Sequence, residues 1–242
     1  ITLPMAPGFV HLHVHSEYSL VDGVARIKPL VGQVAEQQMP AVALTDQSNM
    51  FALVRFYRAA IAAGVKPIAG ADLLVRNPQD TQKPDRLVLL AQDLDGYRNL
   101  TELVSRSYRE GQHLGVPMLE PGWFTAASTA GLIALSGGRD GDVGRALIAG
   151  NLELAKQRLL HWHGLFGDRY YVQLVRTGRP FEEACLHASV SLANAHGIPV
   201  VATNEVCFLS PDEFAAHEVR VCIHEGRTLD DPRRVQKYSA EQ

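Results

Sequence analysis

The sequence has no long apolar run, few cysteines and no excess of basic residues. Its longest apolar segments, such as residues 73–75 and 87–91, are far shorter than the roughly 18 residues of a membrane-spanning helix. Residues 1–8 lack the basic start and long apolar stretch of a secretory leader, so we expect a cytoplasmic protein without membrane contact. Three cysteines at irregular spacing are typical of reduced thiols rather than of a disulfide framework.

The charge balance limits the classes of partner. Twenty-three basic and 26 acidic residues give a formal net charge of −3, which argues against a domain that binds nucleic-acid phosphates over its whole surface. The composition, 46% hydrophobic and 20% charged, is that of a globular protein and excludes disorder. At roughly 150 residues per domain, the 242 residues allow one large α/β domain or two small ones.

Short apolar runs alternate with segments of helical periodicity along the chain. The strand-like runs are residues 9–15, 41–45, 67–75, 86–91, 132–135, 170–175 and 199–203. The helical segments are residues 27–37, 50–63, 96–108, 143–148 continuing into 152–161, and 182–195. This alternation predicts a parallel sheet covered by helices, and seven such units predict an α/β fold closed into a TIM-like βα-barrel. An open, doubly wound sheet is the alternative.

Three histidines alternate along the first predicted strand. His11, His13 and His15 share one face of it, and the carboxyl ends of strands in a βα-barrel open into the active-site mouth. Two imidazoles at this spacing can chelate one metal ion, with Asp22 as an oxygen ligand. In the alternative interpretation, one or two of these histidines are hydrogen-bonded core or rim residues.

Other polar residues follow the predicted strands. Asp46 and Gln47 come after the second, Asp72 lies in the third, and residues 136–138 and 204–207 follow the fifth and seventh. Taken singly, such residues often cap the next helix. Their convergence on one end of a barrel nevertheless predicts a functional site.

Several stretches resemble the PHP (polymerase and histidinol phosphatase) domain of the bacterial replicative DNA polymerase III alpha subunit. They are FVHLHVHSEYSLVDG, MPAVALTDQSNMFALVRFY, GVKPIAGADLLV, GLIALSGGRDGDVGRAL, PVVATNEVCFL and AHEVRVCIHEGRTLDDPRR. The resemblance covers residues 9–242, which leaves residues 1–8 as an N-terminal extension. It implies a distorted seven-stranded βα-barrel at the N-terminal part of a longer polymerase subunit. That parent would be a DNA-directed DNA polymerase, a nucleotidyltransferase of DNA replication, with its catalytic Mg in domains outside this sequence.

Active members of this family hold a trinuclear metal centre with nine ligands. The resemblance implies that three ligand positions are kept, namely His13, His15 and Asp22. Three hold residues that could still ligate, namely Asp72, Glu205 and Cys207. Three hold residues that cannot, namely Gln47, Arg86 and Gly137, where the family has His, His and Cys. Because a guanidinium stays protonated, we expect a vestigial metal site in which Arg86 pairs with a carboxylate among Asp22, Asp72 and Glu205.

Two hypotheses of function follow from the resemblance. In the first, the domain is catalytically inactive, needs no cofactor, and is a structural and docking module that binds the proofreading exonuclease subunit. The remaining polymerase domains would then be its other partners and would contact DNA. In the second, the domain is a residual metal-dependent phosphoesterase or pyrophosphatase with Zn, Mn or Mg at the vestigial site. The aromatic residues Trp123, Phe124, Trp162 and Phe166 are candidate docking anchors or, alternatively, core residues.

Overall fold

The computed structural model of the chain describes residues 8–80 and 82–241, so most of the predicted extension, residues 1–7, lies outside the described residues. The strands are β1 (Ala41–Leu44), β2 (Lys66–Val75), β3 (Asp85–Ala91), β4 (Gln112–His113), β5 (Val116–Pro117), β6 (Leu132–Leu135), β7 (Tyr170–Val175) and β8 (Val200–Thr203). The helices are α1 (Ile27–Glu36), α2 (Leu53–Ala62), α3 (Leu94–Arg109), α4 (Asp142–Ile148), α5 (Leu152–Phe166), α6 (Glu182–Ala195) and α7 (Phe214–Glu225). Short 3-10 turns are η1 (Pro121–Trp123), η2 (Gly138–Asp140), η3 (Gly167–Arg169) and η4 (Pro211–Glu213).

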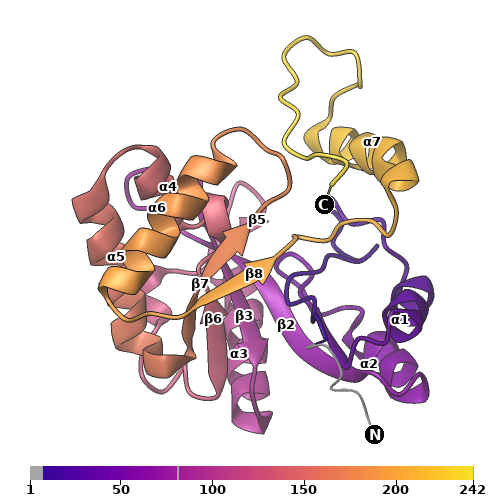
Figure 1. Cartoon of the computed structure of the whole chain (residues 1–242), viewed down its shortest axis with the longest axis horizontal. Coiled ribbons are helices and arrows are strands. Elements are labelled where there is room, and N and C mark those ends of the chain that lie inside the picture. The colour runs from indigo at the N-terminus through magenta and orange to yellow at the C-terminus, as the bar shows by residue number, and fades with distance from the viewer. Residues whose placement is uncertain (1–7, 81, 242) are drawn as a thin grey trace, which may run out of the picture.

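Six strands form one mixed sheet in the order β1-β2-β3-β6-β7-β8, and the sheet curls into a half-barrel flanked by helices (Figure 1). This confirms the predicted α/β class and barrel type. The prediction of an all-parallel sheet is wrong at β3, which runs antiparallel to both β2 and β6. Only residues 76–84 connect β2 to β3, too few for the crossover helix that a parallel connection needs.

The segment predicted as the first strand, residues 9–15, forms isolated bridges rather than a regular strand. His11 bridges Val42 of β1, and Val14 bridges Val206 after β8, both in the parallel sense. The segment therefore lies between the two edge strands of the sheet, in the place of a seventh barrel strand. This position carries His13 and His15 to the same end of the half-barrel as the residues that follow β8.

One apolar cluster contains no helix residue and is the packed interior of the half-barrel. It consists of Ala43, Val88, Leu90 and Leu135, with Leu12, Ile68, Ile133, Tyr171 and Val201 packed against them. A second cluster joins α1 and α2 to β1, and a third joins α3, α4 and α5 to the outer side of β2, β3, β6 and β7. Among the described helices, none combines the length and apolarity needed to cross a membrane.

The aromatic residues predicted as docking anchors belong mostly to the third cluster. Phe124, Trp162 and Phe166 are buried, and the Phe124 and Trp162 rings pack edge to face with centroids 5.0 Å apart. Trp123 is half-buried, with the Arg106 guanidinium 4.2 Å from its ring centroid. The docking interpretation is therefore wrong for the three buried rings, because packing α5 against the sheet already uses their apolar surface.

Candidate functional site

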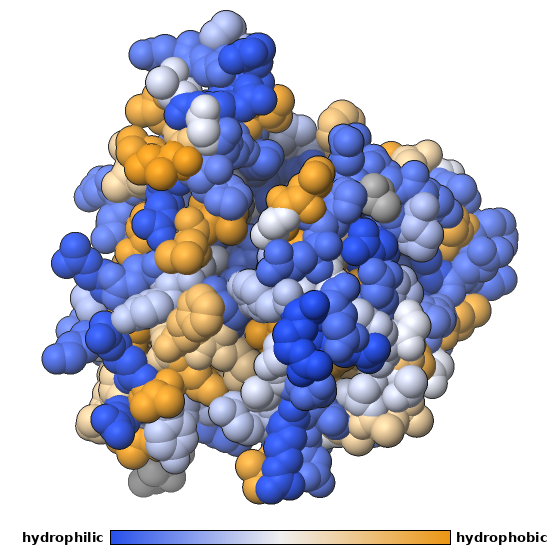
Figure 2. Space-filling view, turned by 180° about the vertical axis from the view of Figure 1, so that it is seen from behind, coloured by the Kyte–Doolittle hydropathy of each residue, from blue (hydrophilic) through white to orange (hydrophobic). Residues whose placement is uncertain are grey.

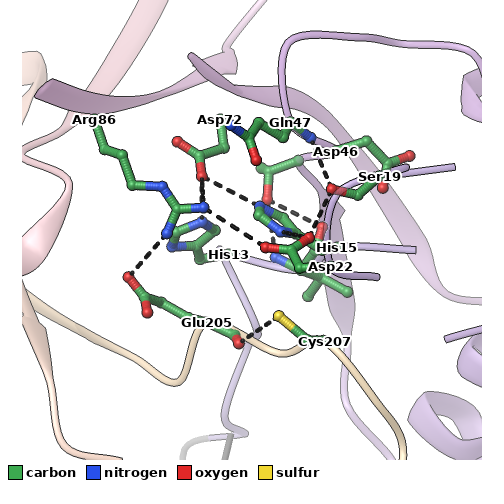
Figure 3. A network of polar contacts seen from close by, with 12 residues as sticks. His13, His15, Ser19, Asp22, Asp46, Gln47, Asp72, Arg86, Glu205 and Cys207 are labelled. Carbon is green, nitrogen blue, oxygen red and sulfur yellow. Dashed lines mark hydrogen bonds and ion pairs between the residues drawn. The ribbon is translucent and has the colours of Figure 1, made fainter. Parts of the chain in front are cut away.

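The site lies at one end of the half-barrel, where side chains from distant parts of the sequence point toward one another (Figure 3). Its centre consists of Asp72 from β2 and Arg86 from β3. Because β3 runs antiparallel, its first residues lie beside the last residues of β2, and Arg86 pairs in register with Leu74. Asp72 and Arg86 are therefore diagonal neighbours on one face of the sheet.

The Arg86 guanidinium lies among three carboxylates. Its Nη2 atom is 2.9 Å from Asp72 Oδ2 and 3.8 Å from Asp22 Oδ2, and its Nη1 atom is 3.7 Å from Glu205 Oε1. The Arg86 side chain is 11% exposed, whereas those of Asp72 and Asp22 are fully buried. The predicted pairing of Arg86 with a carboxylate is thus confirmed, and a fixed positive charge lies at the centre of the acidic cluster.

The neighbouring cations and hydrogen bonds lower the pKa values of the two buried aspartates. Burial alone would raise the pKa of Asp72, but the Arg86 charge and hydrogen bonds from His13 and His15 hold it well below its usual range. Burial likewise opposes ionisation of Asp22, and the charge and hydrogen bond of His15, with Arg86, still lower its pKa. Both carboxylates are therefore ionised at neutral pH, and the surrounding cations balance their charge.

His15 lies between two of these carboxylates. Its Nδ1 is 2.8 Å from Asp22 Oδ1, and its Nε2 is 3.2 Å from Asp72 Oδ2. Burial lowers the pKa of His15, but the Asp22 charge and the hydrogen bonds outweigh burial and raise the pKa well above its usual value. His15 therefore hydrogen-bonds Asp22 through Nδ1 and lies close to Asp72 through Nε2, so its protonated form is a second cation of the site, beside Arg86.

His13 contacts the same oxygen, with Nε2 3.3 Å from Asp72 Oδ2. On the other side of its ring, Nδ1 lies 2.8 Å from Gln173 Nε2, which also donates to Thr203 Oγ1 at 2.6 Å. Gln173 therefore fixes the orientation of the His13 ring from β7. His11 is not part of the site: it is partly buried, and its ring packs edge to face on Phe9, as the core-or-rim alternative allows.

The substituted ligand positions also border the site. Gln47 bridges Asp72 in the parallel sense, and its backbone N–H donates to Ser19 Oγ. Gly137 has a left-handed φ of 75°, and a Cβ atom there would overlap the carbonyl oxygen of Arg86. A cysteine at position 137 would therefore require the backbone to move.

The remaining predicted residues have structural partners. Asp46 accepts hydrogen bonds from the Ser16 backbone N–H at 2.6 Å and from the Ser16 hydroxyl at 2.9 Å, and burial raises its pKa. Cys207 is buried, and burial, followed by the Asp22 charge, raises its pKa to about 11. Its thiol is thus protonated at neutral pH, which makes it a weak nucleophile.

Arg179 and Tyr238, which are not among the predicted site residues, complete the site. Arg179, after β7, is buried and places Nη2 2.6 Å from Glu205 Oε2, with further ion pairs to Glu182 and Asp140. Arg179 lies shortly after the end of β7, and the predicted site residues also lie at or after the ends of strands. The same pattern could therefore have indicated Arg179. The Tyr238 hydroxyl donates to Asp22 Oδ2 at 2.8 Å, and no sequence pattern indicates this contact.

The donor atoms for a metal ion are only partly suitable. Among the described residues, two sets of three place ligand atoms within 4.8 Å of one another: His13, His15 and Asp72, and His15, Asp22 and Cys207. However, Asp72 Oδ2, which both histidines face, is also the atom that Arg86 contacts most closely. The residues present therefore do not fit a nine-ligand metal centre while Arg86 stays in place.

Comparisons with known proteins agree with this fold. The PHP domain family model matches residues 11–177. The chain is 50% identical over 238 residues to the DNA polymerase III subunit alpha of Pseudomonas fluorescens, and 49% identical over 236 residues to that of Escherichia coli K12. Each match covers 98% of this chain and 20% of the relative, so the chain spans about a fifth of the length of these relatives.

Two solved structures share the fold at low sequence identity. An amidohydrolase from Chromobacterium violaceum matches with a TM-score of 0.59 and 14% identity, over 87% of this chain and 96% of that one. A putative metal-dependent phosphoesterase from Bifidobacterium adolescentis matches with a TM-score of 0.55 and 12% identity, over 93% and 100%. The chain therefore belongs to the PHP domain family, and its sequence is similar to the amino-terminal region of proteobacterial DNA polymerase III alpha subunits.

Proposed function

We propose that this chain is a structural and docking module of a replicative DNA polymerase III alpha subunit, and that its metal site has decayed into an ion-pair network. The observation that carries the proposal is the position of Arg86, 2.9 Å from the Asp72 oxygen that His13 and His15 also face. A divalent ion at that oxygen would meet a fixed positive charge within contact distance. Like charges at such separations repel strongly in a buried site, so the guanidinium takes the place of the ion.

In this proposal, the polymerase activity and its Mg belong to the other domains of the cytoplasmic parent protein, which also contact DNA. The partner of the domain is the proofreading exonuclease subunit. An apolar surface before and along α2 supports a role in protein contact, because its side chains recur every three or four residues, which places them on one side of the helix. It consists of Phe51, Val54, Tyr57 and Ile61, each more than half exposed.

The docking role predicts that titrating the purified exonuclease subunit into the wild-type protein gives saturable heat in calorimetry. A contact of standard size would bury about 1,600 Å² in total, enough for binding at micromolar concentrations or below. The Val54→Ser variant measures the contribution of α2 to the affinity for the exonuclease subunit. Val190→Ser is the control, because it removes an exposed valine from α6 instead. Absence of both heat and co-elution at tens of micromolar would contradict the docking role.

Residual metal-dependent phosphoesterase or pyrophosphatase activity is the second candidate function. The two remaining sets of metal-binding donors favour it, as does the likeness in fold to a putative metal-dependent phosphoesterase. Because Arg86 and His15 already neutralise the carboxylates, we expect no turnover of phosphoesters or pyrophosphate in the presence of Zn²⁺, Mn²⁺ or Mg²⁺. Hydrolysis that persists through purification and disappears in a His13→Ala variant would establish the second function instead.

A further inference from the structure

The segment after α7 turns back toward the half-barrel, so that the end of the chain lies between α7 and the sheet (Figure 1). Residues 235–238 line a cleft of about 1130 Å³ that reaches Arg86 and Gln47 at the mouth of the site. Figure 2 shows the molecule from behind, with hydrophobic atoms in separate patches on a mainly hydrophilic face that is hollowed below its upper lobe. The chain's own C-terminal residues are therefore part of the approach to the site.

Contacts hold this segment at both ends and in the middle. Arg234 forms an ion pair with Glu218 of α7, and Lys237 Nζ lies 2.6 Å from Glu225 Oε1 at the end of the same helix. The Ser239 hydroxyl donates to the backbone carbonyl of Thr177, in the loop after β7. Residues 234–239, which we call the strap, thus reach from α7 to the end of a strand on the other side of the mouth.

Tyr238 is the residue through which the strap enters the site. Its ring packs edge to face on His217, with centroids 4.6 Å apart, and its hydroxyl donates to Asp22 Oδ2 at 2.8 Å. The other oxygen, Asp22 Oδ1, also has hydrogen-bond partners: His15 Nδ1 at 2.8 Å and Ser19 Oγ at 2.9 Å. Both oxygens of Asp22 therefore have partners within the protein.

We propose that the strap is an internal lid, and that Tyr238 occupies the approach to Asp22 that an external ligand would use. A hydrogen bond to an ionised carboxylate is stronger than one between neutral groups, and the buried ring contact adds to it. The strap is thus held closed by groups of the site itself. This inference concerns access to the site, and it holds whether or not the domain binds an exonuclease.

Cys207 provides a direct test of access. Its thiol is buried beside Asp22, with the ligand atoms of the two residues within 4.8 Å of each other, so movement of Tyr238 away from Asp22 is expected to expose it to a reagent. Cys185 is also buried, but it lies on α6 beside Gly144 and Ser189. Reaction of the native full-length protein with N-ethylmaleimide, followed by mass spectrometry of the peptides, gives a separate rate for each cysteine.

In Tyr238→Ala, we expect the labelling rate of Cys207 to rise about tenfold or more while that of Cys185 stays unchanged, because only local opening becomes easier. Tyr238→Phe keeps the ring and loses the hydroxyl, so a smaller selective rise is expected. Tyr97→Ala is the control, since Tyr97 is exposed on α3, away from the site and from the apolar surface of α2. Equal Cys207 rates in wild type and Tyr238→Ala would overturn the proposal. If Tyr238→Ala raises both rates together, Tyr238→Phe decides: a selective rise at Cys207 supports the strap, and an unchanged Cys207 rate overturns it.

Discussion

Replacing Arg86 with alanine is expected to lower the free energy of unfolding by about 3–5 kcal/mol, the cost of removing one partner from a buried ion pair. The variant would leave Asp72 without its closest cation, and Asp22 and Glu205 would lose a second positive charge. With both Asp72 and Asp22 fully buried, water cannot easily replace the guanidinium. Urea unfolding of the wild type and the variant, followed by circular dichroism, measures the difference.

The matched control is Arg98→Ala. Arg98 pairs with Asp95 on the surface of α3, and the two side chains are 68% and 77% exposed. Solvent screens such a pair, so stability should stay within about 0.5 kcal/mol of wild type. If Arg86→Ala proved no more destabilising than Arg98→Ala, the site would be wetter than the geometry indicates, and the ion-pair network would lose its structural role.

The positions of the main strands could be predicted because each contains a short apolar run, and most of these runs are buried on the sheet. β1, for example, is buried at all four of its residues. The direction of β3 could not be predicted in this way, because a strand buried on both faces has the same apolar pattern in either direction. Only the short connection, residues 76–84, indicates the reversal.

The candidate site was predictable where it depends on the ends of strands and on family resemblance. His13, His15 and Asp72 do converge, and Glu205 reaches the same network through Arg86. That these residues once held metal stays a prediction.

The contact between Tyr238 and Asp22 could not be predicted from the sequence. It lies 216 positions from Asp22, in a segment with neither helical nor strand periodicity. Contacts of this kind depend on how a loop crosses the finished fold, which no local pattern encodes.

Acidification from pH 6.5 to pH 4 is expected to lower the stability of the protein by up to about 3 kcal/mol through His217 alone, at 1.36 kcal/mol per pH unit. His217 is fully buried beneath Tyr238 and beside Phe208 and Phe214, and neither ring nitrogen has a hydrogen-bond partner among the described residues. Burial lowers its pKa to about 4. The carboxylate of Glu218, 3.5 Å from Nδ1, does not offset this burial, because Arg234 already pairs with it.

The direction follows from proton uptake by the two states. Below pH 6.5 this histidine is protonated in the unfolded chain but not in the folded protein. The free energy of unfolding therefore decreases as the pH is lowered, and it levels off below about pH 4. The depressed pKa values of Asp22 and Asp72 lower stability in the same direction, mainly below the unfolded carboxyl value of 3.8 and only slightly near pH 4. Asp85 acts in the opposite sense, because burial raises its pKa to about 6 and the folded protein takes up that proton first.

Because several groups titrate together, the measurement is a difference between proteins rather than one pH profile. His217→Phe keeps an aromatic ring against Phe208 and Tyr238 and removes the titrating group. Urea unfolding of the wild type and this variant at half-unit steps between pH 7 and pH 4 gives two curves. The free energy of unfolding of the wild type should fall relative to that of the variant as the pH falls, because only the wild type contains the titrating group. A packing cost of the larger ring moves the variant's curve by the same amount at every pH and does not change this trend. Parallel curves over the whole range would mean that His217 takes up its proton at the same pH in the folded and unfolded states, and that burial does not lower its pKa.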